Sequence, residues 1–94
     1  MPPLGIEFSG RFKRQARTLP TGRRAVVADA LGALSIAFGQ PRLHSGLGIR
    51  RLKGAYFEFR VDRDTRVVFK VEGSVASMLL VGCHGDVRRY LKNL

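Results

Sequence analysis

The sequence predicts an α+β fold, in which an N-terminal helical hairpin packs on a small antiparallel sheet and a short helix ends the chain. Apolar residues recur at intervals of three and four over the first 38 positions, and from residue 49 onward they alternate with polar ones. A Gly-Gln-Pro break at 39–41 separates the two patterns. Helical spacing followed by strand alternation is typical of helices that cover one face of an antiparallel sheet.

The N-terminal part is expected to begin with an edge strand at 5–8 and to continue as a basic helix at 10–19. Ser9 is a suitable N-cap, and Pro20 ends the helix because its ring cannot follow a helical turn without a clash. One apolar stripe runs along this segment and comprises Phe8, Phe12, Ala16 and Leu19. The helix should therefore face the sheet along one side.

A second helix is expected at 23–38, with Thr21 as its N-cap. Gly32 inside this helix costs about 1 kcal/mol relative to alanine, so the helix depends on packing. Its expected core face comprises Val27, Ala30, Leu31, Leu34 and Phe38. In the Gly-rich loop that follows, His44 is expected to be exposed to solvent.

The C-terminal half shows the alternation and turn residues of an antiparallel meander. Strands are expected at 49–53, 56–61, 65–71 and 75–82, and a terminal helix at 86–94. Val87, Tyr90 and Leu91 lie along one side of that helix. The length of 94 residues fits a single domain, 1–94.

The charge of the chain points to a polyanionic partner. Lys and Arg number 17, of which thirteen are Arg, against seven Asp and Glu, so the net charge is +10. Nucleic acid or an acidic polypeptide fits this imbalance. One cysteine, Cys83, excludes a disulfide framework and is expected to be a small buried strand residue.

No metal site or cofactor is expected, since no cluster of metal-ligating residues is visible. No apolar run approaches the roughly 18 residues of a membrane span, and the first residues lack the pattern of a signal peptide. The expected location is the cytoplasm, with no membrane partner.

Strand alternation places candidate functional groups on one face of the sheet. Phe57 and Phe59 should face the helices, which leaves Glu58 and Arg60 on the opposite, open face. Pairing across the turn at 62–64 places Arg66 next to Arg60. Two adjacent arginines repel unless a carboxylate or a bound phosphate lies between them. Glu58 and a phosphate are both candidates.

His84 and Tyr90 follow the last strand. Glycines flank His84, whose side chain titrates near neutrality and can act as an acid or a base. A solvated turn histidine is an equally good interpretation of His84. Tyr90 lies about two helical turns further on, and a core-facing aromatic with its hydroxyl at the rim explains it equally well.

Two basic clusters are candidate RNA contacts. Arg50, Arg51 and Lys53 can bind RNA phosphates or form an ordinary solvated sheet edge. Arg88 and Arg89 can bind RNA, or can simply complement the dipole of the last helix.

The chain resembles the RelE/ParE toxin superfamily over nearly its whole length. The motifs that carry the resemblance are Arg51-Leu52-Lys53-Gly54, Tyr56-Phe57-Glu58-Phe59-Arg60-Val61, Thr65-Arg66-Val67-Val68-Phe69, Val81-Gly82-Cys83-His84 and Tyr90-Leu91. The resemblance implies the toxin of a bacterial type II toxin–antitoxin system, which a cognate antitoxin neutralises. In the RelE branch it implies metal-free, ribosome-dependent cleavage of mRNA in the A site, next to ribosomal RNA. In the ParE branch it implies inhibition of DNA gyrase without catalysis. A relative that binds antitoxin and operator DNA without being toxic is a third hypothesis.

The resemblance also implies roles for five residues. Arg60 corresponds to a basic residue that contacts the scissile phosphate, and Arg66 to the strand arginine that stabilises the developing charge. His84 is a candidate general acid, and Tyr90 a residue that stacks on or orients the nucleotide. Glu58 departs from the lysine of the best-known ribonuclease. It is either the base that takes the 2′-hydroxyl proton or a structural partner of the arginines.

Overall fold

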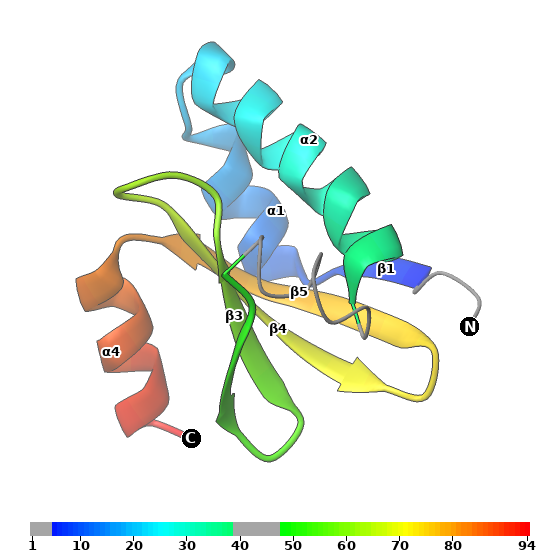
Figure 1. The fold of residues 1–94 in the computed structure, drawn as a ribbon. Helices are drawn as coiled ribbons and strands as arrows, with labels where there is room; N and C mark the ends of the chain where they lie inside the picture. Colours follow the sequence, from blue (N-terminus) through cyan, green and yellow to red (C-terminus); the bar gives the residue numbers. More distant parts are fainter. Residues whose placement is uncertain (1–4, 39–47) are drawn as a thin grey trace.

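The computed structural model describes residues 5–38 and 48–94, so His44 lies outside the described residues. Three helices and five strands lie within them (Figure 1). In chain order they are β1 (Gly5–Phe8), α1 (Gly10–Arg17), α2 (Thr21–Ala37), β2 (Arg50–Lys53), β3 (Tyr56–Arg60), β4 (Arg66–Glu72), β5 (Val75–Gly82) and α4 (His84–Lys92). The α+β class and the order of elements predicted from the sequence are confirmed. No described helix is long and apolar enough to cross a membrane.

The five strands form one sheet in the order β1-β5-β4-β3-β2. Strands β2 to β5 pair antiparallel, as expected, but β1 lies parallel to β5, with Gly5 opposite Val75 and Phe8 opposite Met78. The prediction of a purely antiparallel sheet was therefore wrong. Two parallel strands can pair only when a long connection joins them. Here helices α1 and α2 and strands β2 to β4 lie between β1 and β5 in the chain and provide that connection.

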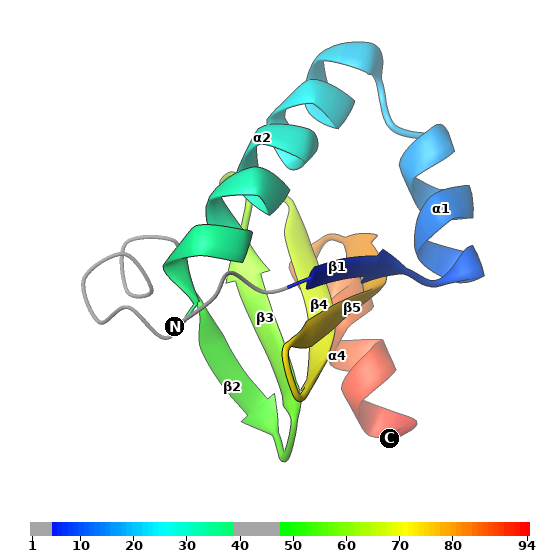
Figure 2. The same ribbon diagram turned by 90° about the vertical axis from the view of Figure 1, so that its right-hand side faces the viewer.

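Helices α1 and α2 lie on one face of this sheet and diverge from their short connection (Figure 2). Phe12 of α1 and Val27 and Leu34 of α2 are buried against Phe59, Phe69 and Met78 of the sheet. The expected core face of α2 is thus confirmed. A strand precedes the two helices, so β1, not a helix, begins the described chain.

The N-termini of the two helices differ in how they are capped. The Oγ of Ser9 accepts a hydrogen bond of 3.0 Å from the backbone N–H of Phe12, which confirms the predicted cap. Helix α2 has no side-chain cap, because Pro20 occupies its N-cap position and Thr21 is already helical. The prediction that Thr21 is the N-cap was wrong. Proline is tolerated at the start of a helix, where its missing N–H is not needed for a helical hydrogen bond, but its side chain has no acceptor atom for a cap.

Helix α4 covers part of the second face of the sheet, opposite α1 and α2 (Figure 1). Val87 is buried against Val68 and Leu80, and Tyr90 and Leu91 pack beside it. The apolar side of this helix was predicted, but its burial on the sheet was not. The second face is therefore not open over its whole area, and this changes the environment of Glu58.

Candidate functional site

Glu58 is buried at the centre of a small cluster of charges. Only 2% of its side chain is exposed, although the sequence placed it on an open face. That prediction was wrong because Glu58 stands beside Val68, on the face of the sheet where α4 packs against Val68 and Leu80. A buried carboxylate is costly unless it is paired. Here the pairing is supplied by two arginines from the neighbouring strands.

The two arginines contact the same oxygen of Glu58. Arg50 of β2 stands opposite Glu58, and its Nη2 lies 2.7 Å from Oε1. Arg66 of β4 lies diagonally across, with Nη1 3.5 Å from Oε1. The other oxygen, Oε2, is buried without a hydrogen-bond partner among the described residues. Glu58 therefore lies between the largely buried guanidinium of Arg66 on β4 and the exposed guanidinium of Arg50 on β2.

Arg60 and Arg66 stand directly opposite each other, as the turn at 62–64 predicted. Arg66 is largely buried and is held by Glu58, whereas Arg60 is exposed and makes no ion pair with another described residue. A guanidinium without a carboxylate partner keeps its full capacity to bind an anion. The strand pair thus presents, side by side, one arginine paired with Glu58 and one that has no ion-pair partner among the described residues.

His84 is the first residue of α4, not a turn residue, and its side chain is exposed. Gly82, two residues earlier, stands opposite Arg66, so the start of α4 lies at the Arg66 end of the sheet. Cys83 is the exposed N-cap of the helix. The prediction that Cys83 is buried in the strand was wrong, because the strand ends one residue before it.

Asp86 anchors the first turn of α4. Its Oδ2 accepts a hydrogen bond of 2.9 Å from the backbone N–H of Cys83, and its Oδ1 pairs with Arg89. The hydrogen bond from Cys83 is the main reason why the pKa of Asp86 is lowered, and the positive charge of Arg89 acts in the same direction. Asp86 therefore caps the N-terminus of helix α4.

Tyr90 is half-buried between α4 and α1. The guanidinium carbon of Arg11 lies 5.7 Å from the centre of its ring. Burial raises the pKa of Tyr90, the neighbouring Tyr56 adds to that effect, and the positive charges of Arg11 and Lys70 oppose it. Lys70 in turn lies with its Nζ 5.4 Å from the centre of the Tyr56 ring. The Tyr90 ring therefore forms one cation–aromatic pair itself, and the Tyr56–Lys70 pair is a second one close enough to affect its pKa.

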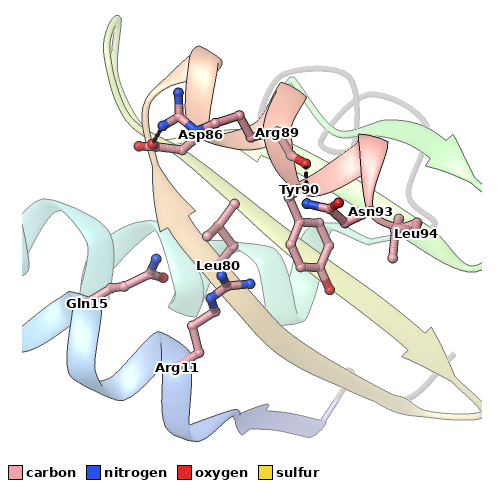
Figure 3. Close-up of a pocket in the computed structure, with 8 residues that line it drawn as sticks. All are labelled: Arg11, Gln15, Leu80, Asp86, Arg89, Tyr90, Asn93 and Leu94. Atoms are coloured by element: carbon pink, nitrogen blue, oxygen red, sulfur yellow. Dashed lines mark hydrogen bonds and ion pairs between the residues drawn. The ribbon is translucent and has the colours of Figure 1, made fainter.

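A cavity of about 560 Å³ opens beside Tyr90, between α1 and α4 (Figure 3). Its lining includes Arg11 and Gln15 of α1, Leu80 of β5, and Tyr90 of α4. Sequence reasoning did not find this cavity. The available signal was the spacing of three between arginines on α1, but the sequence does not show that α4 packs near that helix.

The predicted RNA-contacting residues have different partners in the structure. Arg50 pairs with Glu58, whereas the guanidinium carbon of Arg51 lies 5.4 Å from the centre of the Phe57 ring, on the face that α1 and α2 cover. Lys53 is exposed at the end of β2. On α4, Arg88 is exposed, and Arg89 is paired with Asp86. Within the part of the chain that the structure describes, no three His, Cys, Asp or Glu side chains gather to hold a metal ion.

No protein-family model matches this chain, and no curated protein matches it by sequence. Solved structures match it over nearly the whole fold. A chain of the archaeal RelE–RelB complex from Pyrococcus horikoshii matches with a TM-score of 0.69 at 16% identity, over 90% of this chain and 98% of that one. The chain has the fold of the RelE-type toxins.

Two further structures support the same conclusion. A chain of the E. coli DinJ–YafQ toxin–antitoxin complex matches with a TM-score of 0.65 at 17% identity, over 90% of this chain and 97% of that one. The YoeB/ParE toxin from Agrobacterium tumefaciens matches with a TM-score of 0.63 at 22% identity, over 86% of this chain and 99% of that one. The resemblance inferred from the motifs is thus confirmed at the level of the RelE-type fold.

Proposed function

We propose that this chain, as a single domain, is the cytoplasmic toxin of a type II toxin–antitoxin system and a metal-independent, ribosome-dependent mRNA endoribonuclease. Its partners are a cognate antitoxin, mRNA and the ribosomal RNA of the A site. The observation that carries the proposal is the pair of facing arginines, one free (Arg60) and one anchored by a buried carboxylate (Arg66), at the end of the sheet where His84 begins α4. The RelE-type fold supports the proposal.

The proposed reaction is an attack by a ribose 2′-hydroxyl on the adjacent phosphate, which expels the 5′-oxygen of the next nucleotide. Negative charge builds on the phosphate oxygens, and guanidinium groups bind such oxygens in pairs. Arg60 and Arg66 are proposed to hold the phosphate, and His84 to protonate the leaving oxygen. Tyr90 is proposed to stack on a base next to the cleaved link.

Glu58 is assigned a positioning role in this proposal. A general base must reach the proton that it removes. Glu58 is almost fully buried and its contacted oxygen already faces two arginines. The charge of Glu58, 3.5 Å from Arg66, favours a position of that guanidinium beside β3, which lowers the cost of reorganisation when charge develops on the phosphate. Solvent water is proposed to accept the 2′-hydroxyl proton, while His84 supplies the proton of the leaving oxygen.

The test is primer extension on mRNA after induction of the chain, run beside a plasmid-supercoiling gel. We expect new 5′ ends within translated codons and unchanged plasmid topology. Arg66→Ala and His84→Gln should each reduce cleavage by about 10²–10⁴-fold. Arg63→Ala is the matched control, because Arg63 is an exposed arginine in the adjoining turn and should leave cleavage unchanged.

Two outcomes would overturn the proposal. Intact mRNA with loss of plasmid supercoiling would assign the chain to the gyrase-inhibiting class. Unimpaired growth and intact mRNA after induction without an antitoxin would assign it to the non-toxic, regulatory class. Full cleavage by a folded Arg66→Ala variant would remove Arg66 from the site.

A further inference from the structure

The turn between β3 and β4 is linked to helix α2 by a side-chain hydrogen bond. Arg23 lies in the first turn of α2, and its Nη1 donates a hydrogen bond of 2.9 Å to Oγ1 of Thr65, the residue immediately before Arg66. We propose that Arg23 is a positioning residue of the ribonuclease site, which holds the Arg60–Arg66 pair in place through Thr65. This inference rests on the proposed function and adds to it a residue from the opposite face of the sheet.

The backbone of Thr65 is fixed within the turn. Its carbonyl accepts a hydrogen bond of 2.9 Å from the Val61 N–H, and its own N–H donates 2.8 Å to Oδ1 of Asp62. The side chain of Thr65 faces α2, and the residue is only 2% exposed. Arg23 therefore holds a hydroxyl that is shielded from water, where a hydrogen bond from a charged donor is stronger than at the surface.

The contact at Thr65 determines where the side chain of Arg66 points. Successive side chains of an extended chain point to opposite faces, so a Thr65 side chain held against α2 directs Arg66 to the face that carries Glu58. Val67, the second residue after Thr65, is buried in the core beneath the helices, in agreement with this alternation. Glu58 thus acts on the guanidinium of Arg66, whereas Arg23 acts on the backbone that carries it.

The position of this backbone matters because the two facing arginines repel each other. Arg60 and Arg66 form the pair of the β3–β4 ladder next to the turn, and like charges in directly opposite positions destabilise a strand pair. The repulsion pushes the two strands apart at that end. A hydrogen bond from α2 to Thr65 opposes the separation, because it ties the β4 side of the turn to the helix layer. Both guanidinium groups then stay within reach of one phosphate.

Arg23 also acts on the turn through its charge. The pKa of Asp62 is lowered, chiefly by the hydrogen bond from the Asp64 N–H, and the positive charge of Arg23 acts in the same direction. The next residue, Arg24, has a different partner, since its Nε donates 3.1 Å to the carbonyl of Leu19 in the connection between the helices. Two adjacent arginines of α2 thus differ in their contacts, and Arg24 provides a matched control.

The test compares cleavage rates on programmed ribosomes at several ribosome concentrations. Arg23→Ala and Thr65→Val should each lower the saturated rate by about ten- to hundredfold, because a small displacement of a phosphate-binding group slows the chemical step. The ribosome concentration that gives half the maximal rate should not change. The double variant should be no slower than either single variant, since both changes break one hydrogen bond. Thr65→Ser, which keeps the hydroxyl, and the control Arg24→Ala should both cleave at nearly the wild-type rate.

Three kinetic outcomes would overturn the role of Arg23 and leave the ribonuclease standing. The first is a wild-type rate in both Arg23→Ala and Thr65→Val, and the second is a double variant whose loss is the product of the two single losses. The third is weaker ribosome binding by Arg23→Ala with an unaffected Thr65→Val, which would make Arg23 a direct RNA contact. Absence of cleavage by wild type would instead overturn the ribonuclease, and this role of Arg23 with it.

A measurement without substrate tests the same link in the purified chain. The NMR signal of the Arg66 Nε–H should shift in Thr65→Val and in Arg23→Ala, because the backbone that carries Arg66 moves when the hydrogen bond is lost. Arg24→Ala should leave that signal in place. Arg23 is exposed, so its alanine variant should fold, and circular dichroism checks this. An Arg66 signal that is the same in wild type and in Arg23→Ala would overturn the inference.

Discussion

The buried carboxylate of Glu58 lies 2.7 Å from the guanidinium of Arg50, a side chain that is 66% exposed. The Glu58 side chain is almost completely shielded from water, whereas the Arg50 side chain remains largely hydrated. The carboxylate therefore depends on Arg50 far more than Arg50 depends on the carboxylate. Its second contact, to Arg66 at 3.5 Å, is too long to replace the first.

Arg50→Ala should consequently lower the free energy of unfolding by about 2 kcal/mol, because a buried carboxylate loses its one short charged partner. Urea unfolding followed by circular dichroism measures the change. The double variant Arg50→Ala/Glu58→Gln should recover more than half of the loss, since the buried charge is then gone. Lys53→Ala, on the same strand, is the surface control. An Arg50→Ala protein as stable as this control would show that the ion pair contributes nothing.

Arg66→Lys tests the geometry of the second contact. Lysine keeps the charge but cannot bind two phosphate oxygens in the fixed fork of a guanidinium. We expect cleavage to fall by about tenfold or more, the equivalent of roughly 1.4 kcal/mol of transition-state stabilisation. Rates of product formation on programmed ribosomes measure the effect. A lysine variant with the wild-type rate would reduce the role of Arg66 to that of a simple charge.

The position of Glu58 shows where sequence reasoning succeeds and where it ends. Alternation along β3 correctly predicted the inward faces of Phe57 and Phe59, and the turn correctly predicted that Arg60 faces Arg66. Alternation states only which residues share a face of a strand. It does not show whether a second layer packs on that face of the sheet, as α4 does here against the neighbouring strands β4 and β5. The burial of Glu58 was therefore missed.

The cavity and the parallel edge strand were missed for a related reason. Both depend on segments far apart in the sequence. Arg11 and Tyr90 meet because α1 and α4 flank β5, and β1 meets β5 after a crossover of more than 60 residues. Local periodicity predicts the elements and their exposed sides, whereas such long-range neighbours follow from tertiary packing.

The pH dependence of stability should reveal the cap at the start of α4. The hydrogen bond from the Cys83 N–H lowers the pKa of Asp86 below its usual value of 3.8. The ionised carboxylate therefore stabilises the fold fully above about pH 3.8, and this stabilisation is lost as the pH falls through the lower pKa of the folded state. Urea midpoints should therefore differ between wild type and Asp86→Asn at pH 7, and the difference should shrink below pH 3.8.

Asp29→Asn controls for a general effect of charge, because Asp29 is an exposed carboxylate on α2 that makes no ion pair with another described residue. Its midpoint should follow that of wild type at both ends of the range. A difference between wild type and Asp86→Asn that is constant with pH would mean that Asp86 acts through packing, not through its charge.

The approach of Asp86 to the backbone depends on glycine at position 82. A Cβ at Gly82 would lie 2.5 Å from Oδ2 of Asp86 and 2.9 Å from its Cβ, so Gly82→Ala forces the carboxylate away from the Cys83 N–H. We expect a loss of about 1–3 kcal/mol of unfolding free energy, as for other overpacked sites. Because the first turn of α4 carries His84, the same substitution should also reduce cleavage in the primer-extension assay.

Gly32→Ala is the matched control for this substitution. Nothing lies within 4 Å of a Cβ at this exposed position of α2, so alanine should raise stability by up to about 1 kcal/mol through helix propensity alone. The two glycine variants thus have opposite expected signs in one unfolding experiment. A neutral or stabilising Gly82→Ala would show that α4 begins without the Asp86 cap, and would separate the position of His84 from it.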